Sequence, residues 1–157
     1  MPRWLTYVLI VLVILLLGVA LAAPIGPMPG VRLGGTSATP PALWSAVDLP
    51  EEVLLATSAG VLPHVVIIWV VESDNRLYVI GDPSSTWVGG ATRSPDVQLR
   101  IGDDVYDMRA TRLAAGRQDL IQKYVDRYKG NYPDIIAGFP PMEEFAQGAA
   151  VLELVAR

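Results

Sequence analysis

The chain has 157 residues, of which 52% are hydrophobic and 18% are charged, and its formal net charge is -4. Such an acidic chain has no basic field to attract phosphate backbones, so nucleic acid is not expected as a partner. The absence of cysteine excludes disulfides, thiolate nucleophiles and cysteine-ligated metals.

The first predicted element is an apolar helix. Residues 4–23 carry no charge, and a helix of about 20 such residues spans the ~30 Å hydrocarbon core of a bilayer. We therefore expect a single-pass transmembrane anchor over residues 1–23, with the lipid bilayer as partner through residues 4–23. A cleaved signal peptide is the alternative, because Ala20-Leu21-Ala22 has the small-x-small form of a cleavage site. Arg3 before the span favours a domain outside the cytoplasm.

A linker follows the apolar segment. Residues 24–50 contain six prolines and four glycines, a composition typical of a semi-extended connection. Within it, residues 42–47 are compatible with a short helix that docks Trp44 on the domain. The folded domain is expected over residues 51–157.

The domain begins with three predicted strands. Residues 53–58 and 64–72 are apolar runs of strand length, and the turn between them contains Gly60 and Pro63. Ser73-Asp74-Asn75 has the composition of a tight turn, after which residues 76–82 return as the third strand. A short helical crossing is predicted over residues 84–94.

The next segment predicts a hairpin. If Asp103-Asp104 is a two-residue turn, Ile101 faces Tyr106 and Arg100 faces Asp107. All apolar residues then fall on one face, and Arg100 and Asp107 form a cross-strand ion pair on the other. A slip of one residue would mix the two faces.

Two elements complete the domain. Apolar residues recur at helical spacing between Gly116 and Lys129, which predicts one long helix ended by Gly130. Residues 149–155 predict a terminal strand that closes the sheet. The fold class is therefore mainly β (α+β), with one long helix and a short helical crossover after one N-terminal transmembrane helix.

One stretch of the chain resembles a known family. Residues 76–81 (RLYVIG) and 87–102 (WVGGATRSPDVQLRIG) are similar to the split β-barrel flavoproteins, the pyridoxamine 5'-phosphate oxidase-like family. The closer likeness is to the deazaflavin-dependent nitroreductase branch, in which a Trp precedes an Asn-Pro pair that opens the next strand. Trp87 and Ser94-Pro95 match that pattern, with Ser in place of Asn.

This resemblance implies an antiparallel split β-barrel that forms a homodimer. It also implies FMN or a deazaflavin coenzyme, with the ring against the second and third strands near the dimer seam, and no metal. The coenzyme performs the hydride chemistry while the protein binds and orients it, so no catalytic side chain is expected. The cofactor-binding candidates are Thr57, Ser58, His64, Ile67, Trp69, Ser85, Thr86, Trp87 and Arg93.

The function that follows is a membrane-anchored flavin- or deazaflavin-dependent oxidoreductase acting on a small or lipophilic acceptor such as a quinone. The chain departs from the family at the phosphate, however. The positions that match the family's basic residues are His64, Trp69, Thr86 and Trp87, and only His64 can carry positive charge. The amides and hydroxyls at the start of residues 84–94 offer another anion site. The alternative function is therefore a non-catalytic, membrane-tethered binding or interaction module that has lost the phosphate clamp.

Overall fold

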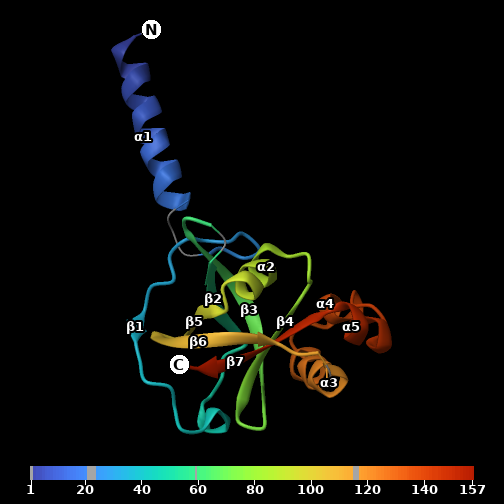
Figure 1. The fold of residues 1–157 in the computed structure, drawn as a ribbon. Coiled ribbons are helices and arrows are strands. Elements are labelled where there is room, and N and C mark those ends of the chain that lie inside the picture. The colour runs from blue at the N-terminus through green and yellow to red at the C-terminus, as the bar shows by residue number, and fades with distance from the viewer. Residues whose placement is uncertain (1, 21–23, 59, 115–116) are drawn as a thin grey trace.

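The computed structural model describes residues 2–20, 24–58, 60–114 and 117–157, and its centre is a closed barrel (Figure 1). The sheet has the strand order β1-β6-β5-β2-β3-β4-β7, and β6 also pairs with β7. Six antiparallel strands therefore close the barrel, while β1 lies parallel to β6 outside it. The strands are β1 (Thr36–Ser37), β2 (Glu52–Ser58), β3 (Pro63–Ser73), β4 (Arg76–Gly81), β5 (Asp96–Ile101), β6 (Asp104–Arg112) and β7 (Ala150–Ala156).

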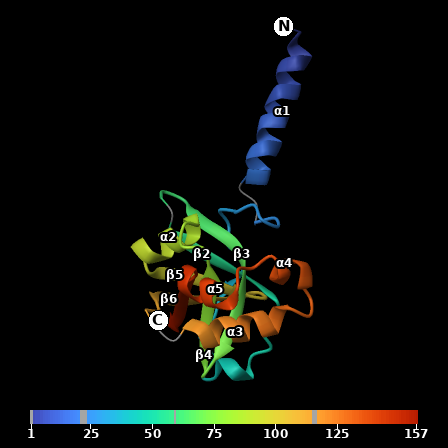
Figure 2. The same cartoon turned by 90° about the vertical axis from the view of Figure 1, so that its right-hand side faces the viewer.

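Helices lie on two sides of this barrel. Figure 2 shows α3, α4 and α5 together over one outer face, and α2 packs against β2, β3 and β6. The helices are α1 (Arg3–Ala20), the 3-10 helix η1 (Trp44–Ala46), α2 (Thr86–Arg93), α3 (Arg117–Tyr128), α4 (Pro133–Ala137) and α5 (Met142–Gly148). The predicted helical crossing, long helix and terminal strand are thus confirmed. Gly116, the predicted first residue of the long helix, lies outside the described residues.

The barrel has two apolar cores because its strands bury both faces. The interior core contains side chains such as Leu55, Val70 and Leu99, each fully buried. The outer core lies between the barrel wall and the helices, where Tyr78 and Ile121 are among the buried residues. A strand buried on both faces is apolar throughout rather than alternating, which is the pattern that residues 64–72 show.

The hairpin of β5 and β6 corrects the predicted register. Ile101 pairs with Asp104 and Leu99 with Tyr106, so the two turn residues are Gly102 and Asp103. Gly102 has φ +60°, as the first residue of a type II′ turn requires. The shift from the prediction is two residues, which keeps the apolar side chains on one face because side chains alternate with period two.

The predicted cross-strand ion pair between Arg100 and Asp107 is consequently wrong. Arg100 instead contacts Asp103 (2.8 Å) and donates to the carbonyl of Leu33 (2.8 Å). Asp107 accepts a hydrogen bond from Gln98 (3.0 Å). The other predicted turn is confirmed: Asp74 and Asn75 both have positive φ between β3 and β4.

The predicted linker is extended, but it runs along the barrel. Gly30 and Val65 exchange two backbone hydrogen bonds of 2.8 Å, and Thr36 donates to the carbonyl of Asp103. Gly35 approaches the barrel so closely that a Cβ there would lie 2.7 Å from Cγ2 of Val105. The segment before η1 is therefore part of the folded domain's surface.

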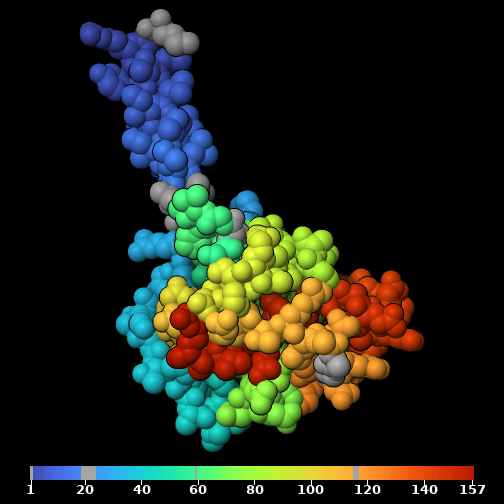
Figure 3. Space-filling model, viewed as in Figure 1, coloured from blue at the N-terminus to red at the C-terminus, as the bar shows by residue number. Residues whose placement is uncertain are grey.

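The N-terminal helix α1 extends away from the barrel (Figures 1 and 3), and its apolar side chains from Val8 to Leu17 are exposed. Among the helices in the described part of the chain, none has the combined length and apolar character for crossing a membrane. The predicted transmembrane helix is therefore not supported. Residues 21–23 of the predicted span lie outside the described residues.

Candidate functional site

Two of the predicted cofactor-binding residues lie where β2 meets α2. Thr57 is buried and donates a hydrogen bond to the carbonyl of His64 (3.4 Å). A Cβ on Gly90 of α2 would come 3.0 Å from Oγ1 of Thr57 and 2.9 Å from the carbonyl oxygen of Ser58. Glycine at this helix position therefore allows α2 to rest directly on the end of β2.

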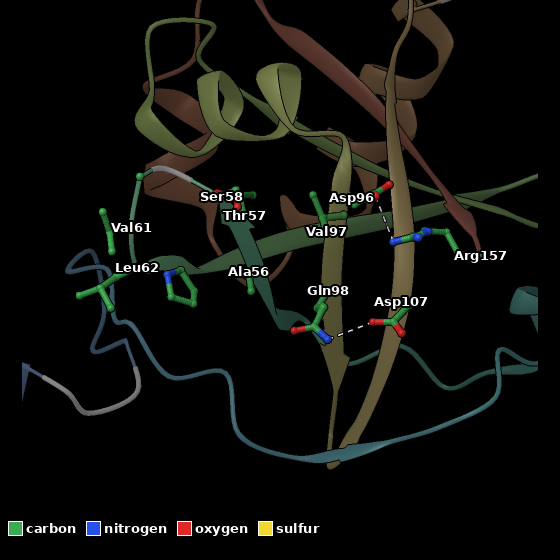
Figure 4. Close-up of a pocket in the computed structure, with 12 residues that line it drawn as sticks. Ala56, Thr57, Ser58, Val61, Leu62, Asp96, Val97, Gln98, Asp107 and Arg157 are labelled. Carbon is green, nitrogen blue, oxygen red and sulfur yellow. Dashed lines mark hydrogen bonds and ion pairs between the residues drawn. The ribbon is translucent and has the colours of Figure 1, made fainter.

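Thr57 and Ser58 also line a cavity of about 360 Å³, here called the turn cavity (Figure 4). Its walls are the β2–β3 turn, the start of β5, β6 and Arg157. Figure 4 shows Val61 and Leu62 on the turn side, while Gln98 and Asp107 point toward each other across the two strands. None of the other predicted site residues lines this cavity.

The turn cavity has no strong attraction for an anion. Arg157 pairs with Asp96 (3.2 Å), and Asp96 also pairs with Arg109 (3.2 Å). Asp107 is a second carboxylate in the wall. The guanidinium of Arg157 is thus already paired with a carboxylate, and these exposed ion pairs are individually weak.

The start of α2 carries the predicted residues Ser85 and Thr86, and just before it a carboxylate of the chain occupies the hydrogen-bond donors of Ser84. Oδ1 of Asp82 accepts from the backbone N–H and the hydroxyl of Ser84, both at 2.7 Å. The hydroxyl of Ser85 donates to the carbonyl of Asp82 (2.7 Å). The hydrogen bonds from the Ser84 hydroxyl and then its backbone N–H hold the pKa of Asp82 below its ordinary value, so the carboxylate is ionised at neutral pH.

Trp87 lies over the end of β4. A Cβ on Gly81 would clash with Cζ2 of Trp87, so the indole ring covers the backbone where a side chain would stand. The ring is half-buried and packs against the interior core. It therefore occupies part of the surface of the third barrel strand, β4, against which the resemblance places the coenzyme ring.

The remaining predicted residues are spread over the barrel. Trp69 lies outside the barrel and stacks on Tyr128, with ring centroids 4.4 Å apart. Ile67 is half-buried opposite Leu54 in β2, and His64 is half-buried at the start of β3. Arg93 is exposed in the last turn of α2. The nine predicted residues therefore do not line one cavity of this chain.

A second cavity, of about 520 Å³, was not predicted. It opens between the end of β4, helix α3, the connection between α4 and α5, and helix α5, and we call it the aromatic cavity. Three aromatic side chains line it together with two carboxylates, Asp82 and Glu144. Its lining residues are Ile80, Gly81, Asp82, Pro83, Tyr124, Phe139, Pro140, Glu144, Phe145, Gly148 and Ala149.

The sequence contains little local signal for this cavity. Tyr124 reads as one position of the apolar stripe of α3, and Phe139 and Phe145 belong to a segment without clear periodicity. Burial is the largest cause that raises the pKa of Tyr124 above its ordinary value, so its phenol stays neutral. Only the folding of α4 and α5 back over β4 brings these rings together.

The residues at the start of α2 do not fit a phosphorylated coenzyme held as the resemblance implies. A bound phosphate needs donors and positive charge, yet the Ser84 donors already bind Asp82. Trp87 stands where a cation would be expected and covers Gly81. In the described residues, no group of three or more histidines and acidic residues could hold a metal ion.

The closed six-stranded barrel with its helical crossing defines a class, the split-barrel proteins. A conserved hypothetical protein of Mycobacterium tuberculosis is 20% identical, with a TM-score of 0.55 over 69% of this chain and 74% of its own. A protein named F420 reductase is 15% identical, with a TM-score of 0.54 over 76% and 96%. A Listeria innocua protein, provisionally named a pyridoxamine 5'-phosphate oxidase, is 15% identical, with a TM-score of 0.50 over 69% and 85%.

These similarities confirm the predicted resemblance at the level of fold: the chain has the pyridoxamine 5'-phosphate oxidase-like split-barrel fold. No family model matches the sequence, and no curated protein matches it either. The chain thus shares the architecture of these proteins at identities that leave its own chemistry to be argued from its own residues.

Proposed function

We propose that this protein binds a small planar molecule on a split barrel that no longer holds the phosphate of a flavin or deazaflavin coenzyme. The hydrogen bonds from Ser84 to Asp82 carry this proposal. They place a negative charge at the helix start that would otherwise receive a phosphate, and two like charges in one site repel each other. The covering of Gly81 by Trp87 supports it independently.

The size of the aromatic cavity supports a small-molecule ligand. Ligand pockets are concave and mostly apolar, with a few polar groups that orient the ligand. The aromatic cavity has this character, since Tyr124, Phe139 and Phe145 contribute rings to a space of about 520 Å³. A ring compound fits such walls through offset or edge-to-face contacts.

Coenzyme binding tests the proposal directly. FMN and riboflavin differ in the phosphate, so the two should be titrated separately into the full chain and followed by flavin fluorescence. We expect no tight FMN complex and no preference for FMN over riboflavin. Asp82→Asn should raise the affinity for FMN, whereas Asp119→Asn, on the exposed face of α3, should not. Purification of the protein with stoichiometric FMN or deazaflavin coenzyme would overturn the proposal.

A coenzyme-dependent reductase is the second candidate, and its support is the structural similarity to the protein named F420 reductase. If this function holds, the chain reduces a quinone or nitroaromatic acceptor when a reduced flavin or deazaflavin is supplied. Saturable turnover that exceeds the reaction without protein would establish this candidate. Turnover equal to that of the reaction without protein would exclude the reductase and leave ligand binding as the proposed function.

Two partners are also proposed. We propose a homodimer, as for the family that the chain resembles, and light scattering of the purified chain tests it.

We also propose that α1 associates with a lipid bilayer, because its apolar side chains from Val8 to Leu17 are exposed to solvent and burying them is favourable. Flotation with phospholipid vesicles, compared for the full chain and a chain lacking residues 1–23, tests this association.

A further inference from the structure

We propose that the aromatic cavity selects a small aromatic molecule that carries a positive charge. The inference rests on the proposed binding function and adds the chemical class of the ligand. It follows from a lining that combines aromatic rings with two carboxylates and, among the described lining residues, contains no lysine, arginine or histidine.

The walls of the cavity are mainly apolar. The ring centroids of Phe139 and Phe145 lie 4.8 Å apart at an interplanar angle of 51°, and Tyr124 of α3 contributes the third ring of the lining. Ile80 and Ala149 are buried residues of the same lining. Aliphatic and aromatic surfaces on several sides favour a ligand whose own body is apolar, because its burial removes apolar area from water.

The charged groups then decide the sign of the ligand's charge. Asp82 and Glu144 belong to different parts of the fold, the loop before α2 and the first turn of α5, yet both line the cavity. Asp82 is held in place by the backbone N–H and hydroxyl of Ser84. A cation is attracted by both carboxylates, while an anion is repelled by both.

The aromatic rings add to this preference. A cation near the face of a phenyl or phenol ring is attracted by the negative face of the ring. Tyr124, Phe139 and Phe145 contribute three such rings to the cavity. An aromatic ammonium ion therefore satisfies both components of the lining, its ring against the apolar walls and its charge toward the carboxylates.

The proposal is tested with three probes that share one ring and differ in charge: tryptamine, tryptophol and indole-3-acetate. Isothermal titration of the full chain measures their affinities at low salt. We expect tryptamine to bind roughly threefold to tenfold more tightly than tryptophol, and indole-3-acetate to bind most weakly, since attraction between partly exposed charges is modest. Raising the salt concentration should reduce this difference because exposed charges are screened.

The matched variants are Glu144→Gln and Glu143→Gln. Both residues are exposed in the first turn of α5, but only Glu144 lines the cavity. Glu144→Gln should lower the affinity for tryptamine and leave that for tryptophol unchanged, whereas Glu143→Gln should change neither. Equal binding of all three probes, or the tightest binding by indole-3-acetate, overturns the charge preference while the binding function stands. Failure of all three probes to bind a folded chain overturns the preference and also counts against the binding function.

Discussion

The hydroxyl of Tyr128 accepts a hydrogen bond from the backbone N–H of Val70 (3.1 Å) and donates one to the carbonyl of the same residue (2.8 Å). This side chain in the last turn of α3 therefore bonds directly to the backbone of β3. Its ring also stacks on Trp69 at an interplanar angle of 13°. The contact fixes the long helix, and with it one wall of the aromatic cavity, against the barrel.

Tyr128→Phe should destabilise the fold by about 1 to 3 kcal/mol, the cost of leaving a buried backbone group without its partner. Urea unfolding of the two proteins measures the difference. Tyr132→Phe is the control, because the Tyr132 hydroxyl bonds to the exposed carboxylate of Glu51 and its loss should cost less. Equal effects of the two substitutions would contradict the special role of the Val70 contact.

Gly102 determines the turn between β5 and β6. Its φ of +60° is unfavourable for residues with a Cβ, so Gly102→Ala should destabilise the protein by about 1 to 2 kcal/mol. Gly130→Ala is the matched control, since its surroundings leave open space for a Cβ and its φ is not positive. Thermal unfolding measures both variants. A neutral Gly102→Ala would indicate that the turn instead includes Asp104, as the sequence alone suggested.

Gly35 holds the segment before η1 against β6. Gly35→Ala combines an unfavourable φ of +82° with a contact of 2.8 Å to the carbonyl oxygen of Asp103, so β1 should separate from the barrel. Hydrogen exchange of Thr36 and Ala38, whose amides bond to the barrel backbone, should then become faster. Gly26→Ala is the control. Gly26 also has a positive φ, but no atom lies within 4 Å of a Cβ at this position. If the amides of Thr36 and Ala38 exchange equally fast in both variants, the unfavourable φ, rather than the close approach to Asp103, causes the change.

Stability should fall at alkaline pH through Tyr132. The hydrogen bond to Glu51 is the largest cause that raises the pKa of Tyr132 to about 12 from the ordinary value of 10.0. The folded state therefore keeps a proton that the unfolded state loses. This contribution is complete below pH 10.0 and is lost as the pH rises toward about 12.

Urea unfolding across this pH range, together with absorbance titration of tyrosinate, measures the effect. Tyr132→Phe should make the alkaline decline in stability shallower. Tyr7→Phe, in the exposed helix α1, should leave the decline unchanged. An identical decline in Tyr132→Phe and the unmodified chain would show that the Glu51 contact does not contribute.

The predicted cofactor-binding residues lie on different faces of the barrel for a physical reason. The resemblance aligns residues along the chain, but side chains of adjacent strand residues point to opposite faces. Trp69 therefore reaches α3 outside the barrel while Val70 lies in the interior core. Whether the nine residues form one cofactor site stays a prediction, since they share no single cavity in this chain.

The sequence by itself determined the elements and their faces. The apolar runs of the barrel strands, the turn at Asp74-Asn75 and the helical stripe from Leu120 to Tyr128 are local patterns, and they produced the expected strands, turn and helix. Only the tertiary structure decided the hairpin register, because a shift of two residues leaves every side chain on its face. It also decided the aromatic cavity, since that cavity joins residues of β4, α3 and α5 that are distant in the sequence.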